Sequence, residues 1–250
     1  MLKALGHQGV GRRCGCALAS QPSRWSLSVR VRAMCTADED KYLELKQLRD
    51  IKSEAFYEQQ SEHRRYFYYV DLQGRLFLEN TRPKNIATSL KSAKFLRFFF
   101  SQLRPNRLAP ADDRSLAAFL EYPFRSPCGK EMNFIKCADR PLVFEDLRQT
   151  DEHDATKGWH FVYGGGELTM PFDPAALRIS LSTGRLYHTV VTKHFPAGVD
   201  ESIGLVRSQL AVELSKHIYL HEDSSTDAQS DTHIGDVEWQ GQRHPLHSIP

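Results

Sequence analysis

Hydrophobic and polar residues alternate along the chain in a pattern that predicts strands joined as hairpins. Four pairs of strand-like segments flank short stretches with turn-forming residues, among them Gly74, Pro141 and Gly184. The expected pairs are 65–70 with 75–79, 131–137 with 142–147, 159–163 with 167–170, and 177–181 with 185–190. Because consecutive strands joined by tight turns run in opposite directions, these pairs predict an antiparallel sheet.

Apolar residues repeat at helical spacing in two other segments. The first begins at Thr88, which can cap a helix, and extends to about Leu103, just before Pro105. The second extends from Ser202 to Leu220, with one apolar stripe that would face the core. Helices inserted among hairpins, rather than alternating with single strands, predict an α+β fold with an inserted helix and a C-terminal amphipathic helix.

The rest of the chain divides by composition. We expect a polar, helix-prone lead-in at 38–64 and a single α+β domain at 65–221. Residues 222–250 then predict a flexible linker with one short terminal strand near 234–241. A short helix is also expected after Pro110. No apolar run reaches the length of a membrane-spanning helix.

Residues 1–37 have the composition of a mitochondrial transit peptide. They contain serines and six basic residues but no acidic one; the basic residues are Lys3, Arg12, Arg13, Arg24, Arg30 and Arg32. Such a segment can form a cationic amphipathic helix on which import receptors and the membrane potential act. A secretory signal needs a continuous apolar stretch, which the arginines interrupt. The alternative is a disordered basic tail. The sequence therefore predicts a mitochondrial protein of the matrix.

Removal of residues 1–37 would change the sign of the net charge. The chain has 33 Lys and Arg against 31 Asp and Glu, and six of the basic residues but none of the acidic ones lie before residue 38. The remaining chain therefore has a net charge of about −4, which does not favour general attraction to nucleic acid.

Several short motifs occur in the order expected for one protein family. They include Tyr66-Phe67-Tyr68-Tyr69-Val70-Asp71, Gln73-Gly74-Arg75-Leu76-Phe77-Leu78, Ser126-Pro127-Cys128-Gly129, Gly164-Gly165-Gly166-Glu167, Gly184-Arg185-Leu186-Tyr187-His188 and Trp239-Gln240-Gly241. With these motifs, the chain from about Arg65 to Gly241 resembles uncharacterised protein family 0598, a family of mitochondrial proteins of unknown function. The resemblance implies a mitochondrial location but no activity that can be assigned to particular residues.

A basic stretch from 80 to 111 is the strongest candidate for a binding surface. It contains seven cations and no acid, interleaved with phenylalanines. The candidate binding residues are Lys91, Lys94, Arg97, Arg104 and Arg107. A cationic helix face over 88–103, with the adjoining loop 123–131, could neutralise phosphates of RNA or of acidic lipid headgroups. The alternative is a solvated helix face balanced by acids elsewhere, with the phenylalanines in the core.

The candidate catalytic residues are few. Cys128 lies in a tight loop, and a nucleophilic thiol there would need a nearby histidine or cation, such as Lys130, to lower its pKa. Cys128 and Cys137 show no C-x-x-C spacing, so we expect ordinary thiols. Enzyme chemistry could instead use a cluster of His160, His188 and His194.

A metal site is not predicted. His217 and His221 are four residues apart on the expected C-terminal helix and could meet one metal ion, but they lack the H-E-x-x-H pattern. Surface histidines are the simpler interpretation.

The sequence thus predicts a binding or accessory protein without catalysis, and its alternative is an enzyme of unrecognised type using Cys128 or the histidines. The partner could be a matrix protein, RNA or an acidic lipid. No cofactor is indicated.

Overall fold

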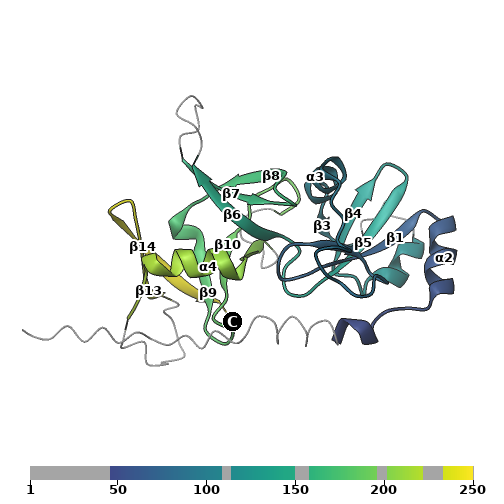
Figure 1. Ribbon diagram of the computed structural model, residues 1–250, viewed down its shortest axis with the longest axis horizontal. Coiled ribbons are helices and arrows are strands. Elements are labelled where there is room, and N and C mark those ends of the chain that lie inside the picture. The colour runs from purple at the N-terminus through teal and green to yellow at the C-terminus, as the bar shows by residue number, and fades with distance from the viewer. Residues whose placement is uncertain (1–45, 109–113, 150–157, 196–201, 222–232, 250) are drawn as a thin grey trace, which may run out of the picture. The chain divides into compact units, whose positions relative to one another are not determined.

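The computed structural model describes residues 46–108, 114–149, 158–195, 202–221 and 233–249 (Figure 1). The predicted transit peptide and the start of the lead-in lie outside these ranges. The described chain forms two mixed β-sheets with few helices, which fits the α+β class. None of the helices among these residues is long and apolar enough to cross a membrane.

Five strands form the first sheet, in the order β2-β1-β5-β4-β3. They are β1 (Arg65–Val70), β2 (Leu76–Leu78), β3 (Arg104–Pro105), β4 (Phe124–Cys128) and β5 (Glu131–Cys137). β1 pairs antiparallel with β2 but parallel with β5. Around this sheet lie α2 (Glu54–Glu62), α3 (Ala93–Ser101) and the 3-10 helix η1 (Arg114–Phe119) (Figure 1).

Nine strands form the second sheet, in the order β12-β13-β14-β9-β10-β11-β6-β7-β8. They are β6 (Val143–Gln149), β7 (Trp159–Tyr163), β8 (Leu168–Pro171), β9 (Leu177–Ser180), β10 (Leu186–Thr189), β11 (Ile203–Val206), β12 (Ile218–Leu220), β13 (His233–Trp239) and β14 (Gln242–Ile249). The short helices here are η2 (Pro174–Ala176), α4 (Ser208–Leu214) and η3 (Ser215–His217). β6 runs parallel to β11, and β9 runs parallel to β14. The expectation of one antiparallel sheet is therefore corrected to two mixed sheets.

The predicted hairpin of 131–137 with 142–147 is wrong, because its two strands belong to different sheets. β5 lies between β1 and β4, whereas β6 lies between β11 and β7. In the connection, the Asp139 carboxylate accepts hydrogen bonds from Arg185 at 2.6 Å and from the Tyr187 hydroxyl at 2.9 Å. Pro141 has no N–H to donate to a strand ladder. Residues 138–141 therefore cross from one sheet to the other.

The predicted helix from Ser202 to Leu220 is helical only in its middle. β11 occupies its start and β12 its end, with α4 and η3 between them. At Gly204 of β11, a Cβ atom would stand 2.7 Å from the Phe144 ring, so glycine lets this strand pack against that ring. Within α4, Leu210 and Leu214 are buried. Apolar residues recur at helical spacing across the whole segment, but only Leu210 and Leu214 of this pattern are buried residues of a helix.

Two other boundaries differ from the prediction. α3 begins at Ala93 instead of Thr88, because the Asn85 side chain accepts hydrogen bonds from the backbone of Ala87 and Thr88 and stabilises a turn there. The single terminal strand expected near 234–241 is a hairpin of β13 with β14. Its turn places Gln240 and Gly241 at positive φ, as a tight hairpin turn requires.

The apolar core has two parts. The larger part includes buried residues of α3, β1, β6, β7 and β10 and so connects the two sheets. The smaller part is an aromatic cluster on the first sheet, made by Phe67, Phe119, Tyr122 and Phe134 with Phe56 and Tyr57 of α2. Side chains alternate across a strand, so the neighbours Phe67 and Tyr68 of β1 join different parts of the core.

Candidate functional site

α3 turns an aromatic face to the core and a cationic face to solvent. Leu96, Phe99 and Phe100 are buried. Lys94, Arg97 and Phe98 are exposed, and a rotation of about 100° per residue places all three on one face of the helix. Phe98 retains 42% of its exposure on the same face as the two cations. The helix is fixed against β4 by the Ser126 hydroxyl, which donates to the Phe99 carbonyl at 2.8 Å.

Three of the predicted binding residues gather at this helix. Lys91 is exposed just before α3, and Lys94 and Arg97 are exposed on it. Within the described ranges, none of the three side chains makes a hydrogen bond or an ion pair. Their charges are therefore available to a ligand from outside.

Lys91 and Lys94 lie at the unfavourable end of the helix, whereas Arg97 lies in its middle. The N-terminus of a helix carries a partial positive charge, so acidic residues stabilise it and basic residues destabilise it. α3 has no acidic residue in its first turn, and its N-cap Ser92 makes no side-chain capping bond. Lys94, in that first turn, does not help the helix to form.

The other two predicted binding residues, Arg104 and Arg107, lie outside α3, in β3 and just after it. Arg104, in β3, is half-buried and donates to the Gln102 carbonyl at 3.2 Å, with the His194 ring 3.3 Å away. The Arg107 carbonyl accepts from Arg125 at 3.0 Å, although the Arg107 side chain is exposed. These arginines are involved in contacts around β3 and β4.

Cys128 does not show the contacts of an activated nucleophile. It ends β4, is half-buried, and is unpaired in any disulfide. No histidine lies within hydrogen-bond distance of its sulfur in the part of the chain that the structure describes. Among the described residues the second thiol is that of Cys137, which approaches the Asp139 carbonyl at 3.3 Å, and burial raises its pKa to about 12. Burial therefore disfavours the thiolate form of Cys137.

The predicted cluster of His160, His188 and His194 does not converge on one point. Within the described ranges, no group of metal-type ligand atoms includes any of these three residues. His188 is buried and packs edge-on against the rings of Phe144 and Phe161. Burial lowers its pKa, so the ring is neutral and structural.

His217 and His221 were predicted to lie on one helix, but they do not. His217 ends η3 and packs against the Trp239 ring, with 5.1 Å between ring centres. His221 follows β12 and lies beside His233 and Asp236 of β13. The spacing of four residues therefore did not identify the partners of His221.

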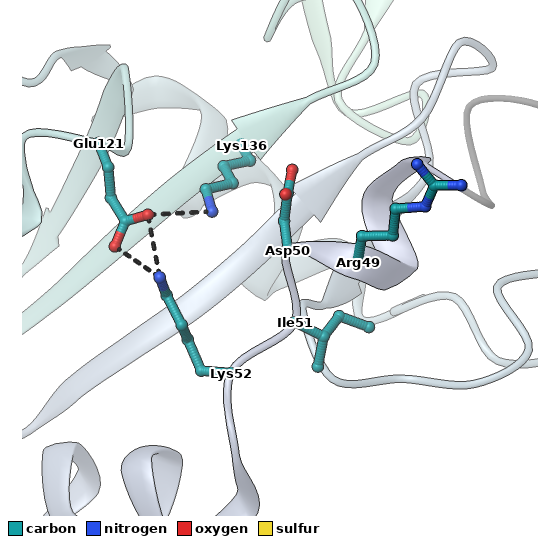
Figure 2. A pocket seen from close by; sticks show the side chains of 6 residues that line it. All are labelled: Arg49, Asp50, Ile51, Lys52, Glu121 and Lys136. Carbon is teal, nitrogen blue, oxygen red and sulfur yellow. Dashed lines mark hydrogen bonds and ion pairs between the residues drawn. The ribbon is translucent and has the colours of Figure 1, made fainter.

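A polar cavity of about 380 Å³ opens where the segment before α2 meets the first sheet. Its lining consists of Arg49, Asp50, Ile51, Lys52, Glu121 and Lys136 (Figure 2). Lys52 and Lys136 both contact the Glu121 carboxylate, at 3.1 Å and 3.5 Å. These two lysines already have a carboxylate partner, so the cavity offers little unbalanced charge to a ligand.

Glu79 forms the buried centre of this network. Its side chain is fully buried, and its carboxylate accepts hydrogen bonds from Tyr57 at 2.9 Å and Tyr122 at 2.8 Å. Lys136 lies 3.4 Å from the same carboxylate and so links it to the cavity. Burial and the nearby Glu79 charge raise the pKa of both tyrosines, which keeps them protonated as donors. The network holds the segment before α2 against the sheet.

Sequence reasoning missed Glu79, His233 and Asp236. Glu79 looked like an ordinary strand residue, because nothing local shows that Tyr57 and Tyr122 approach it. His233 and Asp236 lay in a segment expected as linker and strand, and their proximity to His221 depends on a strand pairing. The only available signal was the high density of histidines after residue 216.

Residues 57–249 match a family described as a domain of unknown function, DUF4505. In structure, the chain is similar to a DUF1285 family protein from Silicibacter pomeroyi DSS-3, with 16% identity and a TM-score of 0.39, over 73% of this chain and 83% of that one. It is also similar to a DUF1285 family protein from Shewanella baltica OS155, with 13% identity and a TM-score of 0.36, over 60% of this chain and 91% of that one. The expectation of an uncharacterised family is confirmed.

Proposed function

We propose that this chain, which belongs to the DUF4505 family, attaches reversibly to anionic lipid surfaces. The contact surface consists of Lys91, Lys94, Arg97 and Phe98, and we call it the α3 surface. The supporting observation is that three exposed cations without ion-pair partners in the described chain accompany a half-exposed phenylalanine. A lipid headgroup layer offers phosphates to the cations and an apolar boundary to the ring.

The expected strength is that of weak, reversible binding. A lysine or arginine near an anionic membrane contributes about 1 kcal/mol, so the three cations contribute about 3 kcal/mol. Insertion of the exposed half of Phe98 adds about 1 kcal/mol. A total of about 4 kcal/mol corresponds to a Kd of about 1 mM for one contact. The α3 surface therefore suits peripheral attachment, which further contacts could strengthen.

The negative charge of the domain does not oppose this contact. Exposed charges are screened over about 8 Å at physiological ionic strength. A lipid surface that touches α3 therefore responds to the local cations more than to acidic residues far from the helix.

The chemistry of the α3 surface favours lipid over RNA. Binding of single-stranded RNA usually relies on several exposed aromatic rings on which bases stack. Three phenylalanines follow Arg97 in α3. Phe99 and Phe100 are buried, and Phe98 is exposed. A single ring among cations suits a headgroup boundary better than a stacking platform.

The location is part of the same proposal. The acid-free, arginine-rich composition of residues 1–37 supports import into mitochondria, with the matrix as destination. Clusters of lysine and arginine are attracted to anionic lipid headgroups, and cardiolipin carries such a headgroup. We therefore propose the matrix face of a cardiolipin-containing membrane as the surface that α3 contacts.

Vesicle co-sedimentation tests the proposed function. The chain without residues 1–37 should sediment with vesicles that contain cardiolipin but not with vesicles of phosphatidylcholine alone. Added salt should release it, because the attraction is electrostatic. The triple variant K91E/K94E/R97E should not sediment with these vesicles, because three attractions of about 1 kcal/mol each become repulsions of similar size.

A matched variant controls for the change in net charge. K46E/K193E/K216E reverses three exposed lysines outside the α3 surface and should bind nearly as well as the unchanged chain. Equal losses in the two triple variants would contradict a specific role for α3. Binding to RNA with no binding to cardiolipin vesicles would also overturn the lipid proposal.

A further inference from the structure

Three metal-type ligands converge at the edge of the second sheet, in the paired strands β12 and β13. His221 follows β12, His233 begins β13, and Asp236 lies three residues further along. One ligand atom from each residue lies within 4.8 Å of the other two. His221 Nε2 is 3.3 Å from one Asp236 oxygen, and His233 Nε2 is 3.3 Å from the other.

The irregular pairing of β13 accounts for this convergence. In a regular strand, residues three apart point to opposite faces of the sheet. The register between β13 and β14 shifts between His233 and Gly235, and such a bulge redirects the side chains that precede it. His233 and Asp236 can therefore approach the same point.

Gly235 brings the third ligand close. A Cβ atom at this position would clash with the Tyr219 carbonyl and would stand 2.9 Å from the Leu220 Cα atom of β12. Glycine thus permits β12 to lie tightly against β13. His221 continues this pairing, because its backbone N–H donates to the Ile234 carbonyl at 3.0 Å. The fold positions all three side chains through backbone contacts.

The ligand atoms are already spaced nearly as a small metal ion requires. A charge-assisted hydrogen bond from a histidine to a carboxylate is typically about 2.7–2.9 Å long. Ligand atoms that surround a tetrahedral zinc ion at about 2.0–2.1 Å lie about 3.3–3.4 Å from one another. The two observed separations of 3.3 Å are close to the second value, but they join the histidines to different oxygens of Asp236. One ligand atom from each of the three residues lies within 4.8 Å of the other two, so small side-chain rotations would bring all three onto one ion.

We propose that His221, His233 and Asp236 bind a divalent transition-metal ion of the Zn²⁺ type. Two imidazoles and one carboxylate form a ligand set that such ions prefer over Mg²⁺ or Ca²⁺, which favour oxygen alone. His221 is exposed and the other two residues are half-exposed, so an ion can enter from solvent. Three protein ligands leave a coordination position for water.

A third histidine lies beside the site. His247 of β14 faces His233 across the strand pair, with 5.7 Å between the ring centres. It lies close enough to support His233 or to complete the coordination after a side-chain rotation. The proposal requires only the first three ligands and does not depend on the α3 surface.

Titration with Zn²⁺ alone tests the site. The full chain, without an affinity tag, is titrated near neutral pH against a chromophoric chelator, and we expect one tightly bound ion per chain. Asp236→Asn keeps the shape of the side chain and removes its charge, and it should weaken binding at least about 10-fold. H221A and H233A should do the same. His244→Ala, on the neighbouring strand β14, is the matched control and should bind like the unchanged chain.

Two further measurements keep the test independent of folding defects. Circular dichroism of each variant shows whether the sheet is retained, and Co²⁺ bound in place of Zn²⁺ should show the visible absorption of a low-coordinate site. These bands should disappear in the folded D236N variant. No stoichiometric Zn²⁺ binding by the unchanged chain, or equal affinity in H233A, D236N and H244A, would overturn the proposal.

Discussion

The carboxylate of Glu79 is fully buried, and a buried charge is stable only when hydrogen bonds and an opposite charge replace the water it has lost. Here Tyr57 and Tyr122 donate to it, and Lys136 lies 3.4 Å away. The Lys136 ammonium also lies over the Tyr122 ring, 4.5 Å from its centre. Each of these residues therefore depends on the others, and removal of one leaves the carboxylate less well solvated.

Tyr122→Phe should destabilise the fold by about 2 kcal/mol, because it removes one donor from a buried, charged acceptor. Urea denaturation followed by circular dichroism would measure the change in the free energy of unfolding. Tyr219→Phe is the control, since the Tyr219 side chain is 53% exposed, and it should change stability by less than about 0.5 kcal/mol. Equal effects of the two substitutions would show that Glu79 does not depend on the Tyr122 hydroxyl.

His188 should make the fold sensitive to mild acid. Burial lowers its pKa from the ordinary value of 6.5, and its Nδ1 donates to the Thr189 carbonyl at 2.7 Å while its Nε2 accepts from the Asp173 N–H at 3.1 Å. The unfolded chain binds a proton on this ring below pH 6.5, whereas the folded chain resists it. The contribution of the neutral His188 ring to the free energy of unfolding is therefore complete above pH 6.5. It is lost as the pH falls from 6.5 towards the lowered pKa.

His188→Asn should remove this pH dependence. The native chain should lose up to about 1.4 kcal/mol per pH unit through His188 in that range. The variant should be less stable at neutral pH, because packing against Phe144 and Phe161 is lost, but its stability should fall less steeply towards acid. Urea denaturation at several pH values compares the two slopes. Parallel slopes would show that His188 is not the titrating group.

At the scale of the element, Lys94 lowers the stability of α3 but is proposed to strengthen binding to lipid. A cation in the first turn opposes the helix dipole, whereas an acid there favours it by about 0.3–1 kcal/mol. K94E should therefore raise the free energy of unfolding by about 0.5 kcal/mol. It should also weaken binding to cardiolipin vesicles about 30-fold, because an attraction of about 1 kcal/mol becomes a repulsion of similar size. Thermal denaturation and co-sedimentation measure the two effects.

K94Q separates charge loss from charge reversal. The stability of K94Q and its affinity for cardiolipin vesicles should both lie between those of the native chain and those of K94E. A K94E variant that is more stable and binds vesicles as well as the native chain would place Lys94 outside the lipid contact.

The elements that the sequence predicts well are those decided by nearby residues. The aromatic segment of β1 with the turn at Gly74, and the apolar face of α3, depend on local spacing. The segment from Ser202 to Leu220 shows the limit of this reasoning. Its helical spacing is genuine at Leu210 and Leu214, but pairing with β10 and β6 holds residues 203–206 as a strand. A tertiary contact thus overrides a local preference.

At the scale of the molecule, the three parallel pairs could not be predicted from local patterns. β1 pairs with β5, β6 with β11, and β9 with β14, and each pair joins segments far apart in the sequence. Parallel strands need a long connection, so no turn motif marks the pairing. The metal-type cluster depends on the same kind of information, because His221 meets Asp236 only when β12 pairs with β13. The cationic α3 surface is local and was therefore visible in the sequence.

The charge of the whole molecule leads to a prediction about import. Residues 1–37 carry six basic and no acidic side chains, whereas the rest of the chain has a net charge of about −4. An inward-negative membrane potential acts on the basic segment and disfavours the acidic remainder.

The full chain should enter isolated mitochondria in a potential-dependent reaction and become resistant to added protease, whereas the chain without residues 1–37 should stay sensitive. A variant with Arg12, Arg13, Arg24 and Arg30 changed to glutamine keeps the segment length and should also fail to enter. Import of that variant at the native rate would show that the positive charge of residues 1–37 does not direct the protein.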